Sequence, residues 1–199
     1  MPRKTKNRKS NTTILVITEG STEKLYLDSF RREVRLHNLT VSPKEATHSS
    51  LDAILKMAFK AYDSGVYDII CCAFDHDVDT TLTRKTRDDL RKARNKGIVF
   101  LDSNPSFEVW FLAHFLLPSH SYSNQGSVID ELNRHIPGYD KKKEWQEKHS
   151  MYQLLHDKLP RAIKNCEQLR ISCVGDEKAT YSNVDKFFTE VVKDYQFSL

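Results

Sequence analysis

The 199-residue sequence lacks the features of several common protein classes. It has only four cysteines and no CxxC pair, which argues against a zinc ribbon or a dithiol redox site. No apolar run approaches the ~20 residues that cross a bilayer, and the basic N-terminus leads into an apolar segment without a small-residue cleavage site. The sequence also contains no GxxxxGK[ST] motif. We therefore expect a cytoplasmic protein with reduced cysteines, no membrane association and no ATPase activity of its own.

Positive charge is concentrated at the start of the chain. Five lysines and arginines lie within residues 1–12, which contain no acid, whereas the formal net charge of the whole chain is +4. The rest of the chain therefore carries a net charge close to zero. We expect residues 1–12 to form a disordered basic tail that either contacts nucleic acid or only aids solubility.

Apolar patterns predict alternating strands and helices in the first 117 residues. Short apolar runs predict strands at 14–18, 39–46, 67–74 and 98–101, and stripes of helical period predict helices at 23–35, 51–64, 83–96 and 107–117. Ser21 or Thr22 is expected to cap the first helix. The alternation favours the α/β class, with a mainly parallel sheet flanked by helices.

The strand signal nearly ends at Pro118. Beyond it, helical patterns cover residues 127–136, 144–158, 160–171 and 182–195. We therefore expect an α/β core over residues 13–117 and a helical C-terminal extension, residues 118–199, packed on that core.

Acidic residues follow two of the predicted strands. Glu19 follows ILVIT, and Asp75, Asp77 and Asp79 alternate after CAF, so that in an extended backbone their side chains share one face. Neighbouring carboxylates repel one another unless a cation or a shared proton compensates, and Mg²⁺ (or Mn²⁺) is the natural cation for oxygen ligands. Because the functional crevice of an open α/β sheet lies at the carboxyl ends of its strands, these acids are expected to form one metal site. Asp79 can instead cap the following helix.

The motifs around these acids resemble a known family. A hydrophobic strand followed by Glu-Gly, and a later one followed by Asp-x-Asp, is the pattern of the Toprim superfamily of topoisomerases, primases and OLD-class nucleases. Within it the chain is similar to RloB-like proteins through EGSTEKLYLDSF (19–30), FDHDVD (74–79), SNPSFEVWFLAHF (103–115) and YSNVDKF (181–187). It departs from them at His76, where a basic residue is frequent, and near Thr180, where a proline is frequent.

The resemblance implies a Toprim-like Rossmannoid core and a metal-dependent nuclease. Such an enzyme would cut DNA or RNA, and tRNA is one candidate. It would act as the effector of an antiviral or abortive-infection system. Proteins of this kind commonly work beside a partner ATPase of the ABC or AAA type. Glu19, Asp75 and Asp77 would hold one or two Mg²⁺ ions during phosphodiester cleavage. Glu23, one helical turn after Glu19, is either a base or ligand of that site or a first-turn acid favoured by the helix dipole.

Two other segments contain candidate site residues. The cations of the helix at 83–96 can grip a phosphate backbone or simply form a solvated face; the candidates are Arg84, Lys85, Arg91 and Arg94, with Lys141–Lys143 weaker. Ser103 and Asn104 precede the apolar helix at 107–117 and can touch a substrate phosphate. Asn104 can also cap this helix, with Pro105 in its first position. Glu108 either accepts hydrogen bonds from backbone N–H groups at the start of the helix or joins the metal shell. We favour the first role for Glu108.

A non-catalytic function is the main alternative. A Toprim-like module could bind nucleic acid or act as a scaffold with a partner ATPase. Nucleotidyl transfer, as in primases, would use the same acids, whereas the chain has no companion domain with the tyrosine nucleophile of a topoisomerase. The sequence is compatible with a homo-oligomer and does not determine substrate sequence.

Overall fold

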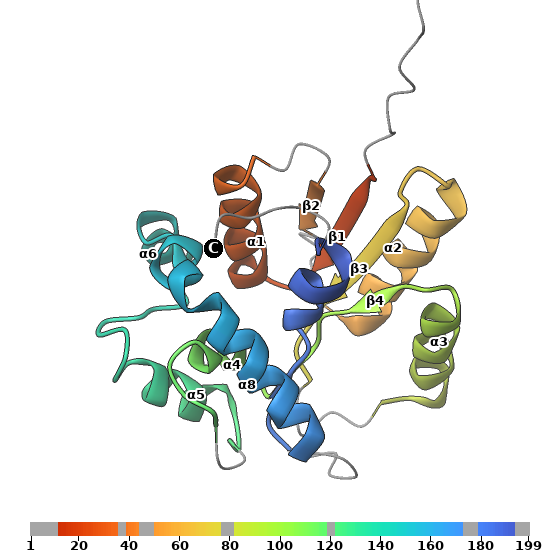
Figure 1. The fold of residues 1–199 in the computed structure, drawn as a ribbon. Coiled ribbons are helices and arrows are strands. Elements are labelled where there is room, and N and C mark those ends of the chain that lie inside the picture. The colour runs from red at the N-terminus through yellow and green to blue at the C-terminus, as the bar shows by residue number, and fades with distance from the viewer. Residues whose placement is uncertain are drawn as a thin grey trace, which may run out of the picture.

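The computed structural model describes residues 12–35, 39–43, 50–76, 82–118, 122–172 and 179–193. At its centre lies a four-stranded parallel sheet with strand order β2-β1-β3-β4 (Figure 1). The strands are β1 (Ile14–Thr18), β2 (Leu39–Pro43), β3 (Ile69–Ala73) and β4 (Val99–Phe100). Each strand predicted from the sequence is present, although β4 has only two residues.

Helices cover both faces of the sheet, which explains the unbroken apolar run of β1. Ile14 and Val16 face α1 (Ser21–Glu33) and the C-terminal helices, whereas Leu15 and Ile17 face α2 (Leu51–Ser64) and α3 (Arg84–Asn95). Figure 1 shows these two groups of helices on opposite sides of the sheet. Strands of a parallel sheet that are buried on both faces need apolar residues at every position, and all of β1 is buried.

Hydroxyl caps begin α2 and α3 but not α1, and because the N-cap of α3 is Thr83, the alternative that Asp79 caps this helix is wrong. Ser50 and Thr83 cap α2 and α3 through their hydroxyls, and Gly65 and Gly97 follow with positive φ. The N-cap of α1 is Gly20, without a side-chain hydrogen bond, so the prediction that Ser21 or Thr22 caps this helix is wrong. Both residues already lie within α1.

The C-terminal half packs mainly against α1. Its elements are β5 (Ser103–Asn104), α4 (Glu108–Ala113), α5 (Gln125–Leu132), α6 (Lys143–Lys148), α7 (Met151–Leu155), the 3-10 helix η1 (His156–Lys158), α8 (Leu159–Ser172), β6 (Tyr181–Ser182) and the π-helical turn η2 (Phe187–Val191). The predicted helix at 144–158 is divided because α6 ends at Lys148 and Ser150 caps α7. The helix predicted from residue 182 is also wrong at its start, because β6 pairs with β5 there.

Helix α4 is at the centre of the C-terminal half. All six of its residues are buried, which confirms the prediction of a buried apolar helix, and Trp110 stacks on Phe188. The helix begins at Glu108 with Phe107 as its N-cap, and Asn104 belongs to β5. Asn104 and Pro105 therefore do not take the cap and first positions expected of them.

Candidate functional site

The carboxyl ends of β1 and β3 bring Glu19 and Asp75 together. Thr18 is opposite Ala73 in the parallel pairing, and the Glu19 backbone N–H donates to the Ala73 carbonyl at 3.0 Å. In return, the Asp75 backbone N–H donates to Glu19 Oε2 at 3.0 Å. The expected meeting of the two strand ends is therefore confirmed for this pair. Asp77 and Asp79 lie outside the described residues.

Glu23 turns back from the first turn of α1 toward the same strand ends. Its side chain is buried, with 4% of the residue exposed, and its Oε2 lies so near Gly20 that a Cβ there would be 2.9 Å away. The glycine of the Glu-Gly motif thus makes room for the second acid. A first-turn acid that only interacted favourably with the helix dipole could remain exposed to solvent.

Glu108 reaches the cluster from the start of α4. It is fully buried, and its carboxylate accepts hydrogen bonds from Tyr139 Oη at 3.1 Å and Gln125 Nε2 at 3.4 Å. Lys141 Nζ lies 3.3 Å from Glu108 Oε1. The expectation of local backbone partners for Glu108 is therefore corrected: side chains of the C-terminal half hold it.

The four acids, Glu19, Glu23, Asp75 and Glu108, form what we call the acid cluster. Burial, aided by the charges of Glu23, Glu108 and Glu19 and opposed by Lys141, raises the pKa of Asp75 to about 9. Burial also raises the pKa of Glu23 to about 7, against its own backbone N–H and Lys141. The carboxylates therefore repel one another electrostatically. Near neutral pH the cluster must either hold a proton or bind a cation.

The chemistry of the acid cluster fits a hard divalent cation. Glu23 Oε2 and Asp75 Oδ1 are buried without a hydrogen-bond partner among the described residues, and such oxygens are costly unless paired. All donors are carboxylate oxygens, the ligands that Mg²⁺ and Mn²⁺ prefer. As the side chains stand, however, no three Asp, Glu, His or Cys residues of the described ranges are grouped closely enough to hold an ion. Binding would need a side-chain rotation or a further donor, the role predicted for Asp77.

A family model described as RloB-like protein matches residues 14–191. The chain belongs to the RloB-like protein family. No curated protein and no solved structure matches it. In the described part of this RloB-like chain, no helix is long and apolar enough to cross a membrane.

Two of the segments that carry the RloB-like resemblance pair with each other. Ser103 Oγ lies 2.9 Å from Ser182 Oγ, and Asn104 Nδ2 donates to the Ala179 carbonyl at 2.7 Å. Ser103 and Asn104 are both buried. These bonds tie β5 to β6, and a contact of either residue with substrate stays a prediction.

Asp102 is a buried acid outside the acid cluster, which sequence reasoning missed. It accepts hydrogen bonds from His76 Nε2, Tyr181 Oη and Asn183 Nδ2 at 2.9–3.0 Å. Burial would raise the pKa of Asp102, but these donors, His76 foremost, hold it at about 2. The ionised carboxylate thus holds the His76 ring, which also contacts the rings of Phe74 and Tyr181. Its position directly after a strand was the one available signal.

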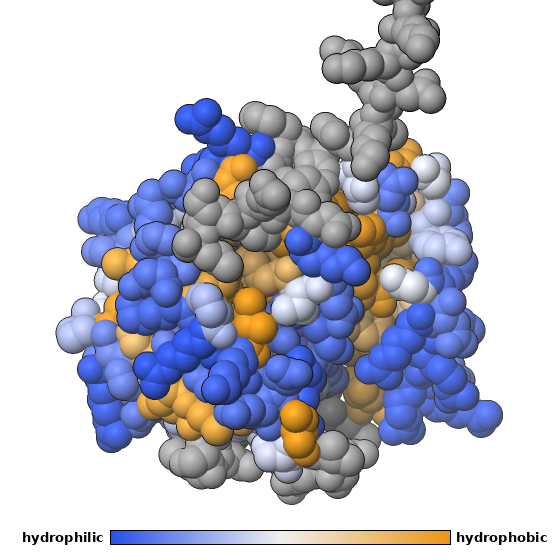
Figure 2. Space-filling model, viewed as in Figure 1, coloured by the Kyte–Doolittle hydropathy of each residue, from blue (hydrophilic) through white to orange (hydrophobic). Residues whose placement is uncertain are grey.

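The candidate cations of α3 lie on an exposed helix face, seen as a hydrophilic surface on the right of Figure 2. Lys85 and Arg91 form ion pairs with Asp89 and Asp88 at 2.9 and 3.0 Å, and Arg94 lies over the Phe100 ring. Exposed pairs of this kind contribute little to stability and are readily exchanged for other partners. Nucleic-acid binding by Arg84, Lys85, Arg91 and Arg94 stays a prediction.

Proposed function

We propose that this RloB-like protein is a Toprim-type, metal-dependent nuclease that cleaves phosphodiester bonds of DNA or RNA at the acid cluster. The observation that carries the proposal is the set of mutually repelling carboxylates at the carboxyl ends of β1 and β3, where half-buried Glu19 and Asp75 meet buried Glu23 and Glu108. Stability alone gives no reason to bury them together, because unpaired carboxyl oxygens destabilise a fold. The resemblance of the Glu-Gly and Asp-x-Asp motifs to Toprim proteins supports the same function.

Mg²⁺ or Mn²⁺ would be held by Glu19, Asp75 and Asp77, with Glu23 and Glu108 beside them and Asp79 as a further candidate ligand. When bound, the metal supplies Lewis-acid stabilisation of the leaving oxygen and a water of lowered pKa. Glu19 is already oriented by the Asp75 backbone N–H. The Glu23 carboxyl, with a pKa of about 7, can exchange a proton near neutral pH.

Lys141 is the cation of the cluster. It is partly exposed, with 35% of its side chain accessible, while it contacts the fully buried Glu108. In the proposed reaction its ammonium group lies where it can attract a substrate phosphate to the carboxylates. The exposed cations of α3 would bind more distant phosphates.

The biological setting is proposed from the resemblance alone. Antiviral or abortive-infection defence, with tRNA as one RNA target, would suit a nuclease of this family. An ABC-type or AAA-type partner would supply ATP hydrolysis, since the sequence has no GxxxxGK[ST] motif.

Cleavage assays test the proposal directly. The purified protein is incubated with plasmid, single-stranded DNA and total tRNA in Mg²⁺, Mn²⁺ or EDTA. We expect cleavage only with metal, and Glu19→Gln, Asp75→Asn and Asp77→Asn to slow it by a hundredfold or more, about 2.7 kcal/mol of transition-state stabilisation. Glu144→Gln, at an exposed acid of α6, is the matched control. Variants of the cluster that cut as fast as the parent would contradict the assignment.

A non-catalytic, nucleic-acid-binding or scaffold module is the second candidate. One observation favours it: within the described ranges no three donors are grouped around a common point, so a shared proton could satisfy the acids instead of a metal. A protein that binds nucleic acid but never cuts it, even with metal and its cognate ATPase, would support this function.

A further inference from the structure

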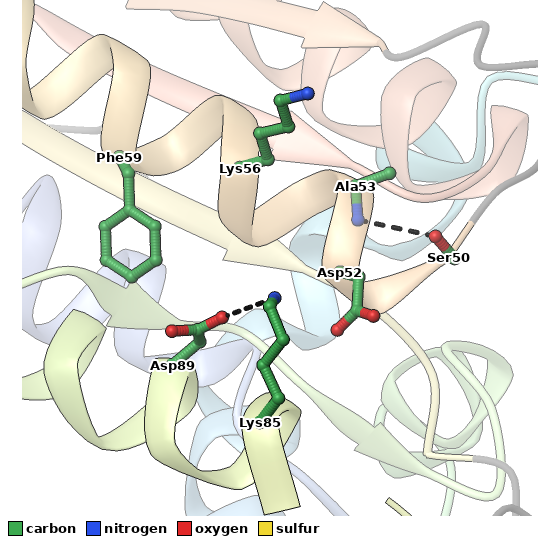
Figure 3. A pocket seen from close by; sticks show the side chains of 7 residues that line it. All are labelled: Ser50, Asp52, Ala53, Lys56, Phe59, Lys85 and Asp89. Carbon is green, nitrogen blue, oxygen red and sulfur yellow. Dashed lines mark hydrogen bonds and ion pairs between the residues drawn. The ribbon is translucent and has the colours of Figure 1, made fainter. Parts of the chain in front are cut away.

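A pocket lies between α2 and α3 (Figure 3). These two helices lie on the side of the sheet away from α1 and the C-terminal helices (Figure 1). The pocket has a volume of about 460 Å³ and is lined by Ser50, Asp52, Ala53, Lys56, Phe59, Lys85 and Asp89. This volume falls within the range of about 300–1,000 Å³ typical of small-ligand sites. None of these residues belongs to the acid cluster.

The lining of the pocket combines an aromatic ring, two cations and two carboxylates. Figure 3 shows Phe59 projecting from α2 toward Asp89 of α3, whose Oδ2 lies 2.9 Å from Lys85 Nζ. Asp52 is held at the other end, because its Oδ1 accepts a hydrogen bond from the Thr86 hydroxyl at 2.8 Å. The two helices therefore hold one carboxylate beside the ring and the other at the far end of the pocket.

The pocket opens near the same edge of the sheet as the acid cluster. Helices that follow parallel strands begin at the carboxyl edge of the sheet, where Glu19 and Asp75 lie. Ser50 and Ala53 belong to the start of α2, and Lys85 to the first turn of α3. The pocket thus lies on the α2–α3 side of β3, the strand that leads into Asp75.

Charge favours an anionic ligand that continues beyond the pocket. Six lysines and arginines of α3 stand against two acids, and the surface around this helix is hydrophilic (Figure 2). Exposed Arg84 and Arg87 extend the cationic surface from Lys85 along the start of the helix. A chain of phosphates matches this distribution better than a single small anion does.

We propose that the α2–α3 pocket binds one unpaired nucleotide of the nucleic-acid substrate, with a preference for bases that carry an exocyclic amine. The base stacks on Phe59, Lys56 and Lys85 contact the flanking phosphates, and Asp52 or Asp89 accepts a hydrogen bond from the amine. Cytosine offers such a donor, whereas thymine and uracil present a carbonyl oxygen at the same position. The proposal rests on the nucleic-acid substrate of the proposed function, and it adds a single-stranded or flipped base to it.

Binding is measured by fluorescence anisotropy in a Glu19→Gln background, with short labelled oligo-dC, oligo-dT and a duplex. We expect oligo-dC to bind about fivefold or more tightly than oligo-dT, and Phe59→Leu to weaken binding by at least about fivefold through lost stacking. Tyr62→Leu is the control, since Tyr62 is an exposed aromatic of the same helix outside the pocket. Asp52→Asn keeps an acceptor for Thr86 and should reduce the preference for oligo-dC.

A second pair of variants keeps the test independent of folding, because Phe59 is partly buried. Lys56→Glu should weaken binding, whereas Lys60→Glu, one turn further along α2 and outside the pocket, should have a much smaller effect. The inference would be overturned if Phe59→Leu weakened binding no more than Tyr62→Leu and Lys56→Glu no more than Lys60→Glu. It would also be overturned if the duplex bound as tightly as oligo-dC. Neither result would contradict metal-dependent cleavage. Pocket-dependent binding by a parent protein that never cleaves would instead overturn the nuclease and leave the pocket in place.

Discussion

Gly20 shows how one residue without a side chain shapes the acid cluster. Its φ of −127° is open to any residue, so the backbone conformation does not require glycine. A Cβ, however, would lie 2.9 Å from Glu23 Oε2. The Glu-Gly pair of the motif therefore acts as a unit with the glutamate three residues later.

Gly20→Ala is expected to displace the Glu23 carboxylate and to lower divalent-metal affinity and cleavage. The free energy of unfolding should change by less than about 1 kcal/mol, since only the end of a flexible side chain must move. Calorimetric titration with Mn²⁺ and thermal melts measure the two effects. Gly126→Ala, where the new Cβ meets only Asn124 Oδ1, is the control. Equal metal affinity in the two variants would show that Glu23 is not part of the metal site.

The raised pKa values of Glu23 and Asp75 predict how stability depends on pH. Their values of about 7 and about 9 exceed the ordinary 4.5 and 3.8, so the folded state binds protons more tightly than the unfolded state. The free energy of unfolding must then fall as pH rises from about 4 to 9. We expect the melting temperature in EDTA to decline over this range, less so in Asp75→Asn, and Mg²⁺ to restore it at alkaline pH.

Asp102 acts in the opposite sense and in a separate pH range. Its pKa of about 2 lies below the ordinary 3.8, so its contribution to stability is complete above about pH 4 and is lost on acidification.

The outcome that would contradict the prediction for Glu23 and Asp75 lies at higher pH. A melting temperature in EDTA that stays constant between about pH 5 and 9 would show that the pKa values of these two acids are not raised.

The loop before α6 carries Lys141 into the site from the C-terminal half. Lys141 lowers the pKa of both Glu23 and Asp75. Lys141→Met should therefore raise both values and extend the alkaline loss of stability to higher pH. Melting curves against pH, compared with those of Lys142→Met, check this, because among the described residues the Lys142 side chain forms an ion pair with the partly exposed Asp140 and not with the cluster. Identical curves for the two variants would show that Lys141 is not near these acids in solution.

Local signals determine which elements could be predicted. The strands β1 and β3 and the acids after them follow from apolar runs and from the edge at which parallel strands end. Strand β6 has two residues, and its partner β5 lies 79 residues earlier, so no local pattern indicates it. The partners of Glu108 were missed for the same reason: Tyr139 and Lys141 approach it only through the packing of the C-terminal half. The sequence favours Ser21 or Thr22 as the cap of α1 because both have hydroxyl groups. That Gly20 takes this position and leaves room for the Glu23 carboxylate depends on the packing of Glu23, which no sequence pattern indicates.

At the scale of the whole molecule, the basic tail remains a sequence prediction, since residues 1–11 lie outside the described residues. Its five cations can each neutralise one phosphate, worth roughly 0.9 in log–log salt slope on a duplex or ~0.7 on a single strand. Removing residues 1–11 is expected to weaken nucleic-acid binding and to reduce the slope without abolishing cleavage. Anisotropy titrations at several KCl concentrations measure it, and equal slopes before and after truncation would show that the tail does not contact nucleic acid.

The acid cluster and the hydrogen bonds of Asp102 together draw on segments between residues 19 and 183, and this bears on the order in which the protein is made. Glu19, Glu23 and Asp75 emerge from the ribosome first, whereas Tyr139 and Lys141, which hold Glu108, follow much later. Asp102 acquires its partners Tyr181 and Asn183 only near the end of synthesis. A nascent chain that stops in the middle thus exposes the carboxylates without the cation and the hydrogen bonds that arrange them. If the acid cluster is the nuclease site proposed above, unfinished copies of the protein are expected to be inactive.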